Sequence, residues 1–405
     1  MKRYANFDLS SRNTFRMKVR CALYLEVTEE SDLPALDWAA LPQPVMVMGG
    51  GSNLLFTKDF PGTVLHVGIG GGETPFGGRV HPRTRAGGGA RWIQVPEGDA
   101  VDNGRGRSER SERSSSEGSL SVTVPAGVVF DDFCGWAASE GLWGPENLSL
   151  IPGEVGASAV QNIGAYGVEA KDIIADIRAW DRTEGRFVHI DPVDCAYGYR
   201  TSKFKTEWKG RYIITAVTYR LSRDPKPVLD YGGIRKALEM RSFVTTVPQD
   251  DKRIVPQDDS CHSERSEESL TPQIIRDTII GIRNQKLPDP AVTGSAGSFF
   301  CNPVISQEHF ARIVAIAQKD NGPEYQVPHY VVGDHIKVPA AWMIEQCGFK
   351  GVRHGGAQVY PNQPLVIVNA SGEASPEEII GLERRVIDAV AAKYAITLHP
   401  EVEHV

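Results

Sequence analysis

The chain of 405 residues has few cysteines and no long apolar run. Its six cysteines lie far apart, form no Cys-x-x-Cys pair, and mostly have apolar neighbours. This pattern favours reduced, buried thiols over a disulfide framework or a zinc site, so no metal site is expected. No apolar run approaches the ~18 residues of a membrane span, and the first residues lack the apolar core of a signal peptide. We therefore expect a cytoplasmic protein.

The chain also lacks a surplus of basic residues. Its 44 basic and 51 acidic residues give a formal net charge of −7. This balance argues against a general nucleic-acid binder, and no basic run is present for a membrane surface. Hydrophobic residues make up 41% and charged residues 23%, as in ordinary globular proteins. At this length, two or three domains can each have a core.

Two familiar nucleotide-binding patterns are absent. A compact apolar strand over 44–48 continues into Gly49-Gly50-Gly51-Ser52-Asn53. The backbone N–H groups of such a loop can converge on a phosphate. However, no Lys-Ser/Thr pair follows, and the residues are neither a Walker A motif nor a Gly-x-Gly-x-x-Gly fingerprint. For the glycines alone, a tight turn without a ligand is an equally good interpretation.

The stretch over 151–167 has hardly any charge. It holds four glycines, one proline and one asparagine among small apolar residues. A surface linker would be more polar, and a helix or strand would hold fewer glycines. We therefore expect irregular backbone, with glycines where a Cβ atom would block a close approach. Such a stretch is typical of a loop that lines a bound cofactor.

Two segments have almost nothing to bury. The regions at about 97–120 and 246–272 both contain a Ser/Glu/Arg-rich run, which predicts disorder. Their similarity indicates insertions of related sequence into surface loops, which the entropy of loop closure tolerates. Composition alone gives no reason to expect that either insert binds a partner.

The remaining pattern predicts an α+β protein rather than a regular Rossmann alternation of strand and helix. Strands are expected over 18–27, 44–48, 63–67, 90–95, 121–124, 172–181, 186–190, 211–221 and 365–369. Helices are expected over 31–40, 130–139, 274–284, 307–318, 340–346 and 376–394, the last of them opened by a capping box at Ser375.

Six segments occur in an order that resembles one known family. They are Asn13-Thr14-Phe15, Gly49 to Asn53, Ile151 to Glu169, Tyr199-Arg200-x-Ser202, Gly297-Ser298-Phe299-Phe300 and His399 to Val402. Together they resemble the UDP-N-acetylenolpyruvoylglucosamine reductases, flavoenzymes of bacterial peptidoglycan precursor synthesis, in their longer, type I form. The resemblance extends over almost the whole chain, and the two inserts are the main departures from it.

The resemblance implies a fold and a set of domains. An FAD-binding domain of the vanillyl-alcohol-oxidase (PCMH) type would comprise two subdomains, 1–67 and 68–225. A smaller α/β substrate domain would cover 226–396, and a tail over 397–405 would return to the active site. FAD would be held without a Rossmann fingerprint. The implied cofactor-binding residues are Gly49, Gly50, Gly51, Ser52, Asn53, Pro152, Gly153, Gly156, Ala157, Ser158, Gln161, Asn162, Ile163, Gly164 and Gly167.

The resemblance also implies a reaction. NADPH would reduce the flavin and leave, and the enolpyruvyl ether of UDP-N-acetylglucosamine would then receive the hydride. Hydride addition to the terminal carbon leaves negative charge beside the substrate carboxylate, so the site must supply positive charge and a proton.

Three residues match the family's catalytic positions. By resemblance, Arg200 grips the carboxylate, Ser298 is the general acid, and Glu401 is a carboxyl that desolvation keeps protonated to stabilise the enol. Considered alone, these residues would be a surface ion pair, a turn serine and a solvated carboxylate.

Further residues match substrate-binding positions. Lys286 would contact a substrate phosphate or carboxylate, and Tyr231 would close over the UDP-sugar. The other candidates are Tyr199, Asn302 and Tyr325, the last two for the uridine diphosphate pocket. The expected partners are the UDP-sugar and NADPH, and a monomer is expected.

Two other functions stay open at this point. One is a flavin oxidase of the same fold that uses molecular oxygen on another substrate. The other is a non-catalytic protein that binds a flavin or a nucleotide sugar and has been damaged by its inserts. The presence of Arg200, Ser298 and Glu401 argues against both.

Overall fold

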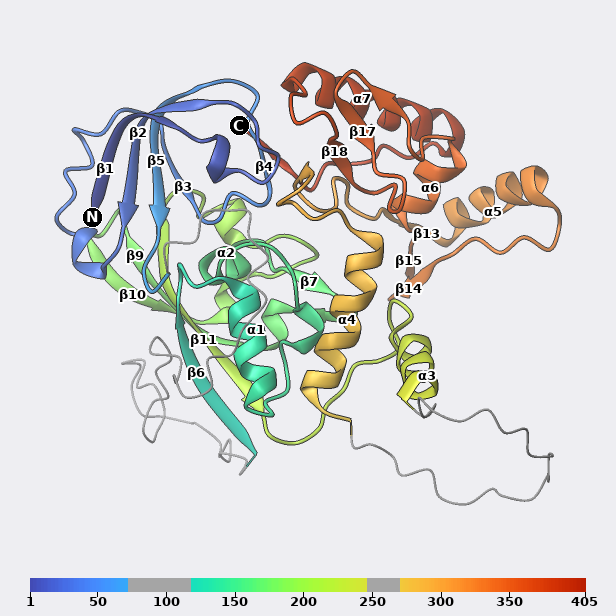
Figure 1. Ribbon diagram of the computed structural model, residues 1–405, viewed down its shortest axis with the longest axis horizontal. Coiled ribbons are helices and arrows are strands. Elements are labelled where there is room, and N and C mark those ends of the chain that lie inside the picture. Colours follow the sequence, from blue (N-terminus) through green and yellow to red (C-terminus); the bar gives the residue numbers. More distant parts are fainter. Residues whose placement is uncertain (72–117, 246–269) are drawn as a thin grey trace, which may run out of the picture. The chain divides into compact units, whose positions relative to one another are not determined.

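The computed structural model describes residues 1–71, 118–245 and 270–405 (Figure 1). The chain divides into two compact units. Unit 1 consists of Met1–His81 together with Asn284–Val405, and unit 2 is Pro82–Arg283. The division into domains at residues 67, 225 and 396 stays a prediction. The strand expected over 90–95 and most of both inserts lie outside the described residues.

Unit 1 contains a mixed sheet built from the start of the chain. In sheet order its strands are β1 (Lys2–Asp8), β2 (Arg20–Val27), β5 (Phe60–Val67) and β3 (Val45–Met48). β1 is antiparallel to β2, whereas β2 and β3 are both parallel to β5. The glycine-rich turn follows β3 and leads into β4 (Leu54–Leu55). β4 pairs in parallel with β19 (Glu403–His404), which joins the last residues of the chain to the first sixty.

The rest of unit 1 comes from the last third of the chain. One antiparallel sheet contains β12 (Gly294–Ser295), β18 (Ile367–Asn369), β17 (Ala357–Val359) and β16 (Arg353–His354), and a second contains β13 (Val304–Ser306), β15 (His335–Lys337) and β14 (Tyr330–Val332). The helices are α5 (Gln307–Asn321), α6 (Ala340–Gln346) and α7 (Pro376–Tyr394). The predicted capping box of α7 is confirmed, because Ser375 and Glu378 exchange side-chain to backbone hydrogen bonds.

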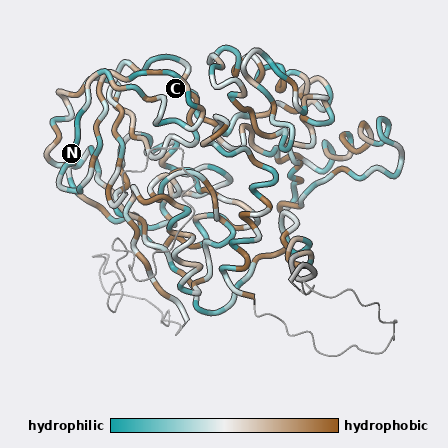
Figure 2. Tube along the Cα trace, viewed as in Figure 1, coloured by the Kyte–Doolittle hydropathy of each residue, from teal (hydrophilic) through white to brown (hydrophobic). Residues whose placement is uncertain are grey.

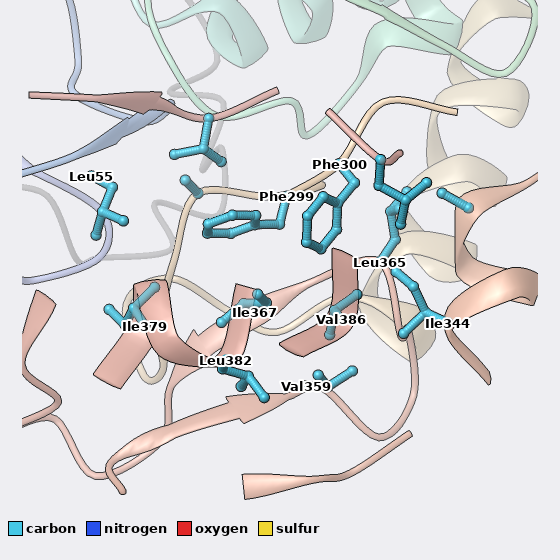
Figure 3. Close-up of a cluster of buried hydrophobic side chains, with 14 of the residues drawn as sticks. Leu55, Phe299, Phe300, Ile344, Val359, Leu365, Ile367, Ile379, Leu382 and Val386 are labelled. Atoms are coloured by element: carbon cyan, nitrogen blue, oxygen red, sulfur yellow. The ribbon is translucent and has the colours of Figure 1, made fainter. Parts of the chain in front are cut away.

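The core of unit 1 fixes the segment that carries Ser298. Phe299 is 0% exposed and Phe300 1%, and their ring centroids lie 5.1 Å apart. Figure 3 shows both rings among Leu55 of β4, Ile367 of β18 and the apolar face of α7. Burying a Phe side chain contributes roughly 1.5–3 kcal/mol, so the backbone beside Ser298 is held by the core on its C-terminal side.

Unit 2 is built around an antiparallel sheet. Its strands, in order, are β10 (Arg186–Ile190), β9 (Ile174–Asp181), β11 (Tyr212–Ser222) and β6 (Ser119–Pro125). The hydrophobic run of β11 is visible in Figure 2. The ring of Tyr219 on β11 stacks on Phe133, with centroids 4.5 Å apart. This contact packs α1 (Phe130–Ser139) on the sheet.

The other elements of unit 2 lie around this packed layer. They are α2 (Val155–Val160), the hairpin strands β7 (Gly164–Ala165) and β8 (Val168–Glu169), α3 (Ile234–Thr245), and α4 (Pro272–Lys286), whose last three residues belong to unit 1. No helix in the described ranges has the length and apolar character needed to span a bilayer.

Most predicted elements are confirmed, several with identical bounds, but two predictions need correction. The helix expected over 31–40 is wrong, since only a 3₁₀ turn at Glu30–Asp32 forms. Further on, the Asp37 carboxylate accepts the N–H groups of Ala39 and Ala40 at 3.2 and 3.3 Å, a local turn that competes with a helix. The stretch over 151–167 is not wholly irregular, because it contains α2 and β7. β1 and α3 were not anticipated.

Candidate active site

In unit 2, the glycines of the 151–167 stretch permit close packing against protein. The N–H groups of Val155 and Gly156 donate to the carbonyls of Val128 and Ala126, both at 2.9 Å. A Cβ atom at Gly156 would lie 2.8 Å from the Cβ of Ala126. Real Cβ atoms do not approach that closely, so glycine at 156 lets α2 lie directly on the turn after β6.

Asn162 joins this stretch to the segment that precedes Arg200. Its side chain is 0% exposed, and its amide donates to the Gly198 carbonyl at 2.9 Å and to the Glu169 carboxylate at 3.0 Å. Its side-chain oxygen accepts the Lys171 N–H at 3.0 Å. The hydrogen bond from Lys171 to Glu169 raises the pKa of Lys171. These bonds use both N–H groups of the amide and one of the two acceptor positions of its oxygen within the protein.

Arg200 is held against the same stretch. Its backbone is in the left-handed region, with φ of 56°. Its guanidinium donates to the Asn162 carbonyl at 3.3 Å and to the Gly164 carbonyl. The Glu169 carboxylate lies 3.9 Å away, and the ring centroid of Tyr199 lies 5.0 Å from Cζ. These contacts hold the guanidinium in place within unit 2, and its role toward an anionic substrate stays a prediction.

Two other predicted residues of unit 2 contact neighbouring elements. Ser158 is buried, and its hydroxyl donates to the Val155 carbonyl at 2.7 Å and lies 2.9 Å from the Tyr219 hydroxyl. Burial raises the pKa of the Tyr219 phenol. At the other end of the stretch, a Cβ atom on Gly167 would lie 3.4 Å from the Cβ of Tyr231. The structure thus places Tyr231 beside the end of the predicted flavin loop.

In unit 1, the glycine loop packs on the Asn13 segment. Gly51 has φ of 63°, and a Cβ atom there would collide with the Arg12 carbonyl. The Thr14 N–H donates to the Gly51 carbonyl at 3.2 Å. The Asn13 side chain donates to the Leu9 and Met17 carbonyls, at 2.8 and 3.1 Å. These bonds fix the segment on which the glycine loop packs.

Unit 1 also brings the Ser298 and Glu401 segments together. The Glu401 N–H donates to the Phe299 carbonyl, the residue after Ser298, at 2.8 Å. The Asn53 side chain donates to the Glu401 carbonyl at 3.0 Å. Gly297 supplies a left-handed turn immediately before Ser298, with φ of 72°.

Two of the remaining substrate-site candidates, Asn302 and Tyr325, have contacts that build the framework of unit 1. The Asn302 side-chain oxygen accepts the Ala340 N–H at 2.9 Å, which caps the start of α6. The Tyr325 hydroxyl accepts the Trp342 indole N–H, also at 2.9 Å. Lys286 is the last residue of α4. Their roles toward a substrate stay predictions, as do those of the cofactor-binding candidates in the two loops.

Some supporting residues were not found from the sequence. Glu169 and Lys171 complete the network around Arg200, but no local pattern marks them because Arg200 lies much further along the chain. In the described ranges, no group of three or more His, Cys, Asp or Glu side chains could hold a metal ion. The five cysteines described are all thiols, and three are buried.

Comparison with known proteins accounts for this arrangement. Residues 289–405 match the C-terminal domain model of UDP-N-acetylenolpyruvoylglucosamine reductase, and residues 109–191 match a model of an FAD binding domain. A UDP-N-acetylenolpyruvoylglucosamine reductase of Bacteroides fragilis (strain YCH46) is 39% identical to this chain, over 98% of this chain and 99% of its own. The chain belongs to the UDP-N-acetylenolpyruvoylglucosamine reductase family. The predicted resemblance is confirmed.

Other members of the reductase family agree. The reductase of Porphyromonas gingivalis (strain W83) is 37% identical, over 99% of this chain and 98% of its own. The crystal structure of the family member from Thermus caldophilus covers 100% of this chain with a TM-score of 0.57 and 18% identity, and 98% of that chain is matched. The predicted fold class, an α+β flavoprotein with an FAD-binding domain and a reductase C-terminal domain, is confirmed.

Proposed function

We propose that this protein is the FAD-containing oxidoreductase that uses NADPH to convert the enolpyruvyl ether of UDP-N-acetylglucosamine into UDP-N-acetylmuramate, for peptidoglycan precursor synthesis. The observation that carries the proposal is the similarity to relatives named for the reductase, at 34–39% identity over nearly the whole chain. An oxidase of the same fold has no comparable support.

The residues of the two loops fit an FAD group. After β3, Gly51 has the left-handed conformation that lets successive backbone N–H groups form a concavity for a phosphate. The 151–167 stretch adds a second backbone with little charge, packed closely on its own unit. When bound, FAD supplies the means of carrying a hydride from NADPH to the sugar. The residues that would hold it are those of Gly49–Asn53 and 152–167.

Three side chains of this chain would act on the substrate. The double bond of the enolpyruvyl group gains a hydride at its terminal carbon and a proton at the carbon beside the carboxylate, while NADPH is oxidised. Arg200 would bind the carboxylate and stabilise the developing negative charge. Ser298 would give its hydroxyl proton to the carbanionic carbon, and Glu401, as a neutral carboxyl, would stabilise the enol form.

The finer assignments complete the proposal. Tyr199, Tyr231, Lys286, Asn302 and Tyr325 would contact the UDP-sugar. The FAD-binding subdomains would cover 1–67 and 68–225, the substrate domain 226–396 and the tail 397–405. The enzyme would act as a monomer in the cytoplasm, where NADPH and UDP-sugars occur.

One experiment tests the proposed function. The purified protein should be yellow, and it should oxidise NADPH rapidly only when the enolpyruvyl UDP-sugar is added. The consumption of NADPH and of oxygen would be followed together. Rapid oxygen-dependent turnover without the sugar would support the oxidase instead, and a colourless protein that cannot be reconstituted with FAD would contradict both enzymes.

A further inference from the structure

The tail, residues 397–405, is hydrogen-bonded along both of its edges within unit 1 from His399 onward. On one edge, the Cys301 N–H donates to the His399 carbonyl at 2.9 Å, and the Glu401 N–H donates to the Phe299 carbonyl at 2.8 Å. On the other edge, the N–H groups of Glu403 and Val405 donate to the carbonyls of Asn53 and Leu55, at 3.0 and 2.9 Å. The tail therefore connects the Ser298 segment to the segment that follows the glycine loop. Figure 1 shows the end of the chain beside β4.

Side chains hold the tail at several points along its length. The Thr57 hydroxyl donates to the Val405 carbonyl oxygen at 2.8 Å. The His404 imidazole lies 3.2 Å from the Glu383 carboxylate of α7. Its ring centroid is also 6.2 Å from that of Phe299. These contacts anchor the tail beyond Glu401.

Asn53 makes a contact at Glu401 itself. Its side-chain amide donates to the Glu401 carbonyl at 3.0 Å, while its own carbonyl accepts the Glu403 N–H at the same distance. One residue thus contacts the tail on either side of Val402, which is 3% exposed. A strand that slips by one residue turns its side chains to the opposite face. This pair of bonds opposes such a slip next to Glu401.

We propose that Asn53 is a positioning residue, whose side-chain amide fixes the tail so that the Glu401 carboxyl keeps its place relative to Ser298. The inference rests on the proposed function, because it takes Glu401 and Ser298 as catalytic. It gives the Asn53 side chain a different task from the cofactor contact that the glycine loop predicts. The amide acts through another residue and does not take part in the chemistry.

The two tasks predict different kinetics. If Asn53 acts through Glu401, its loss slows the step in which the sugar reoxidises the flavin. Small misplacements of a catalytic group cost up to about 100-fold, so we expect Asn53→Ala to slow this step by roughly 10- to 100-fold. In the same variant, the factor by which flavin reduction by NADPH slows should be at least tenfold smaller. If Asn53 instead holds the cofactor, Asn53→Ala slows both half-reactions and weakens FAD binding.

The test uses the holoenzyme in stopped-flow measurements of each half-reaction, with NADPH and then with the enolpyruvyl UDP-sugar. The variants are Asn53→Ala, Glu401→Gln and the double variant. Asn321→Ala is the matched control, because its amide also donates to a backbone carbonyl of unit 1, that of Ala317, at 2.9 Å. Asn321 also donates to the Gln346 side chain at 3.4 Å. The control should leave both rates within about twofold of the original, because neither bond involves Ser298, Glu401 or the glycine loop.

The double variant decides the mechanism. Added to Glu401→Gln, Asn53→Ala should slow reoxidation by no more than about a further twofold, because residues that act as a unit are not additive. The inference would be overturned if the rate losses of the two single variants multiplied in the double variant. It would also be overturned if Asn53→Ala lost FAD and slowed both half-reactions equally. If Asn53→Ala does not fold, Asn53→Leu keeps the shape without the donor, and the same outcomes apply.

The experiment also separates this inference from the proposed function. An unchanged reoxidation rate in Glu401→Gln would remove the catalytic role of Glu401, and the inference with it. If Glu401→Gln slowed reoxidation and Asn53→Ala left it unchanged, the inference would be overturned while the proposed function would stand.

Discussion

At the scale of single residues, the absence of a side chain at Gly164 decides where the Arg200 guanidinium lies. A Cβ atom at this position would be 2.7 Å from Nη1 of Arg200 and 3.0 Å from Cγ of Glu169. It would also lie 3.0 Å from the backbone carbonyl oxygen of Val168. The nearest of the three atoms is the end of a flexible side chain, so the largest shift would be that of the guanidinium, with a smaller adjustment of the backbone at Val168. Gly164 is therefore a sensitive way to probe the placement of the charge.

We predict that Gly164→Ala slows flavin reoxidation by the UDP-sugar by about tenfold or more, since a 1 Å misplacement can cost up to about 100-fold. The measurement is the rate of each half-reaction in the holoenzyme. Gly281→Ala is the control, because an added Cβ there meets nothing within 4 Å and Ala favours the helix. Equal rates in the two variants would show that the Arg200 position does not limit the reaction.

The Ser298 hydroxyl gives a second prediction at this scale. Ser298→Ala should still accept electrons from NADPH, while reoxidation by the sugar slows by orders of magnitude, because only the second step needs the proton. Transient absorbance of the flavin reports both steps. If the two half-reactions slowed equally, Ser298 would be a structural turn residue.

At the scale of elements, α1 and α4 are joined by a charged pair inside unit 2. Arg276 of α4 is 3% exposed, and its guanidinium binds both carboxylate oxygens of Asp131 in α1, at 2.5 and 2.9 Å. One of these oxygens also accepts the Leu150 N–H at 2.6 Å. The pair therefore fixes two helices and the start of the predicted flavin loop together.

We predict that Arg276→Met lowers the free energy of unfolding by about 2–4 kcal/mol, because it leaves a partly buried carboxylate without its partner. Asp131→Asn combined with Arg276→Met should cost less than the sum of the two single changes. Urea unfolding measures these differences. Arg186→Met, which breaks an exposed pair with Glu184, should cost about 0–1 kcal/mol. A similar small loss for Arg276→Met would contradict the prediction.

Elements with strong local signals were predictable from the sequence. The capping box at Ser375 and the apolar spacing that follows it gave α7 with its observed bounds. α2 was missed because it is only six residues long and contains a glycine and two β-branched valines, which offset the helix propensity of its two alanines. It is helical because its small residues allow it to lie on Ala126, a contact that no local pattern reveals.

At the scale of the whole molecule, the motifs identified the family, but their physical partners could not be predicted. The glycines over 151–167 suggested space for a cofactor, whereas Gly156 and Gly164 permit contact with Ala126 and Arg200. The bond from Asn53 to Glu401 joins residues 348 positions apart. Sequence spacing gives no information about contacts between residues so far apart, so only the three-dimensional structure reveals them.

Unit 1 is built from both ends of the chain, and this has a consequence for synthesis on the ribosome. Domains fold as their residues emerge, the N-terminal ones first. Unit 2 is complete at Arg283, whereas the N-terminal part of unit 1 shares its hydrophobic core with residues that emerge later. β4 gains its partner only when β19 emerges. The part of the chain made first is thus among the last to finish folding, and during that interval it is the part most exposed to chaperones and proteases.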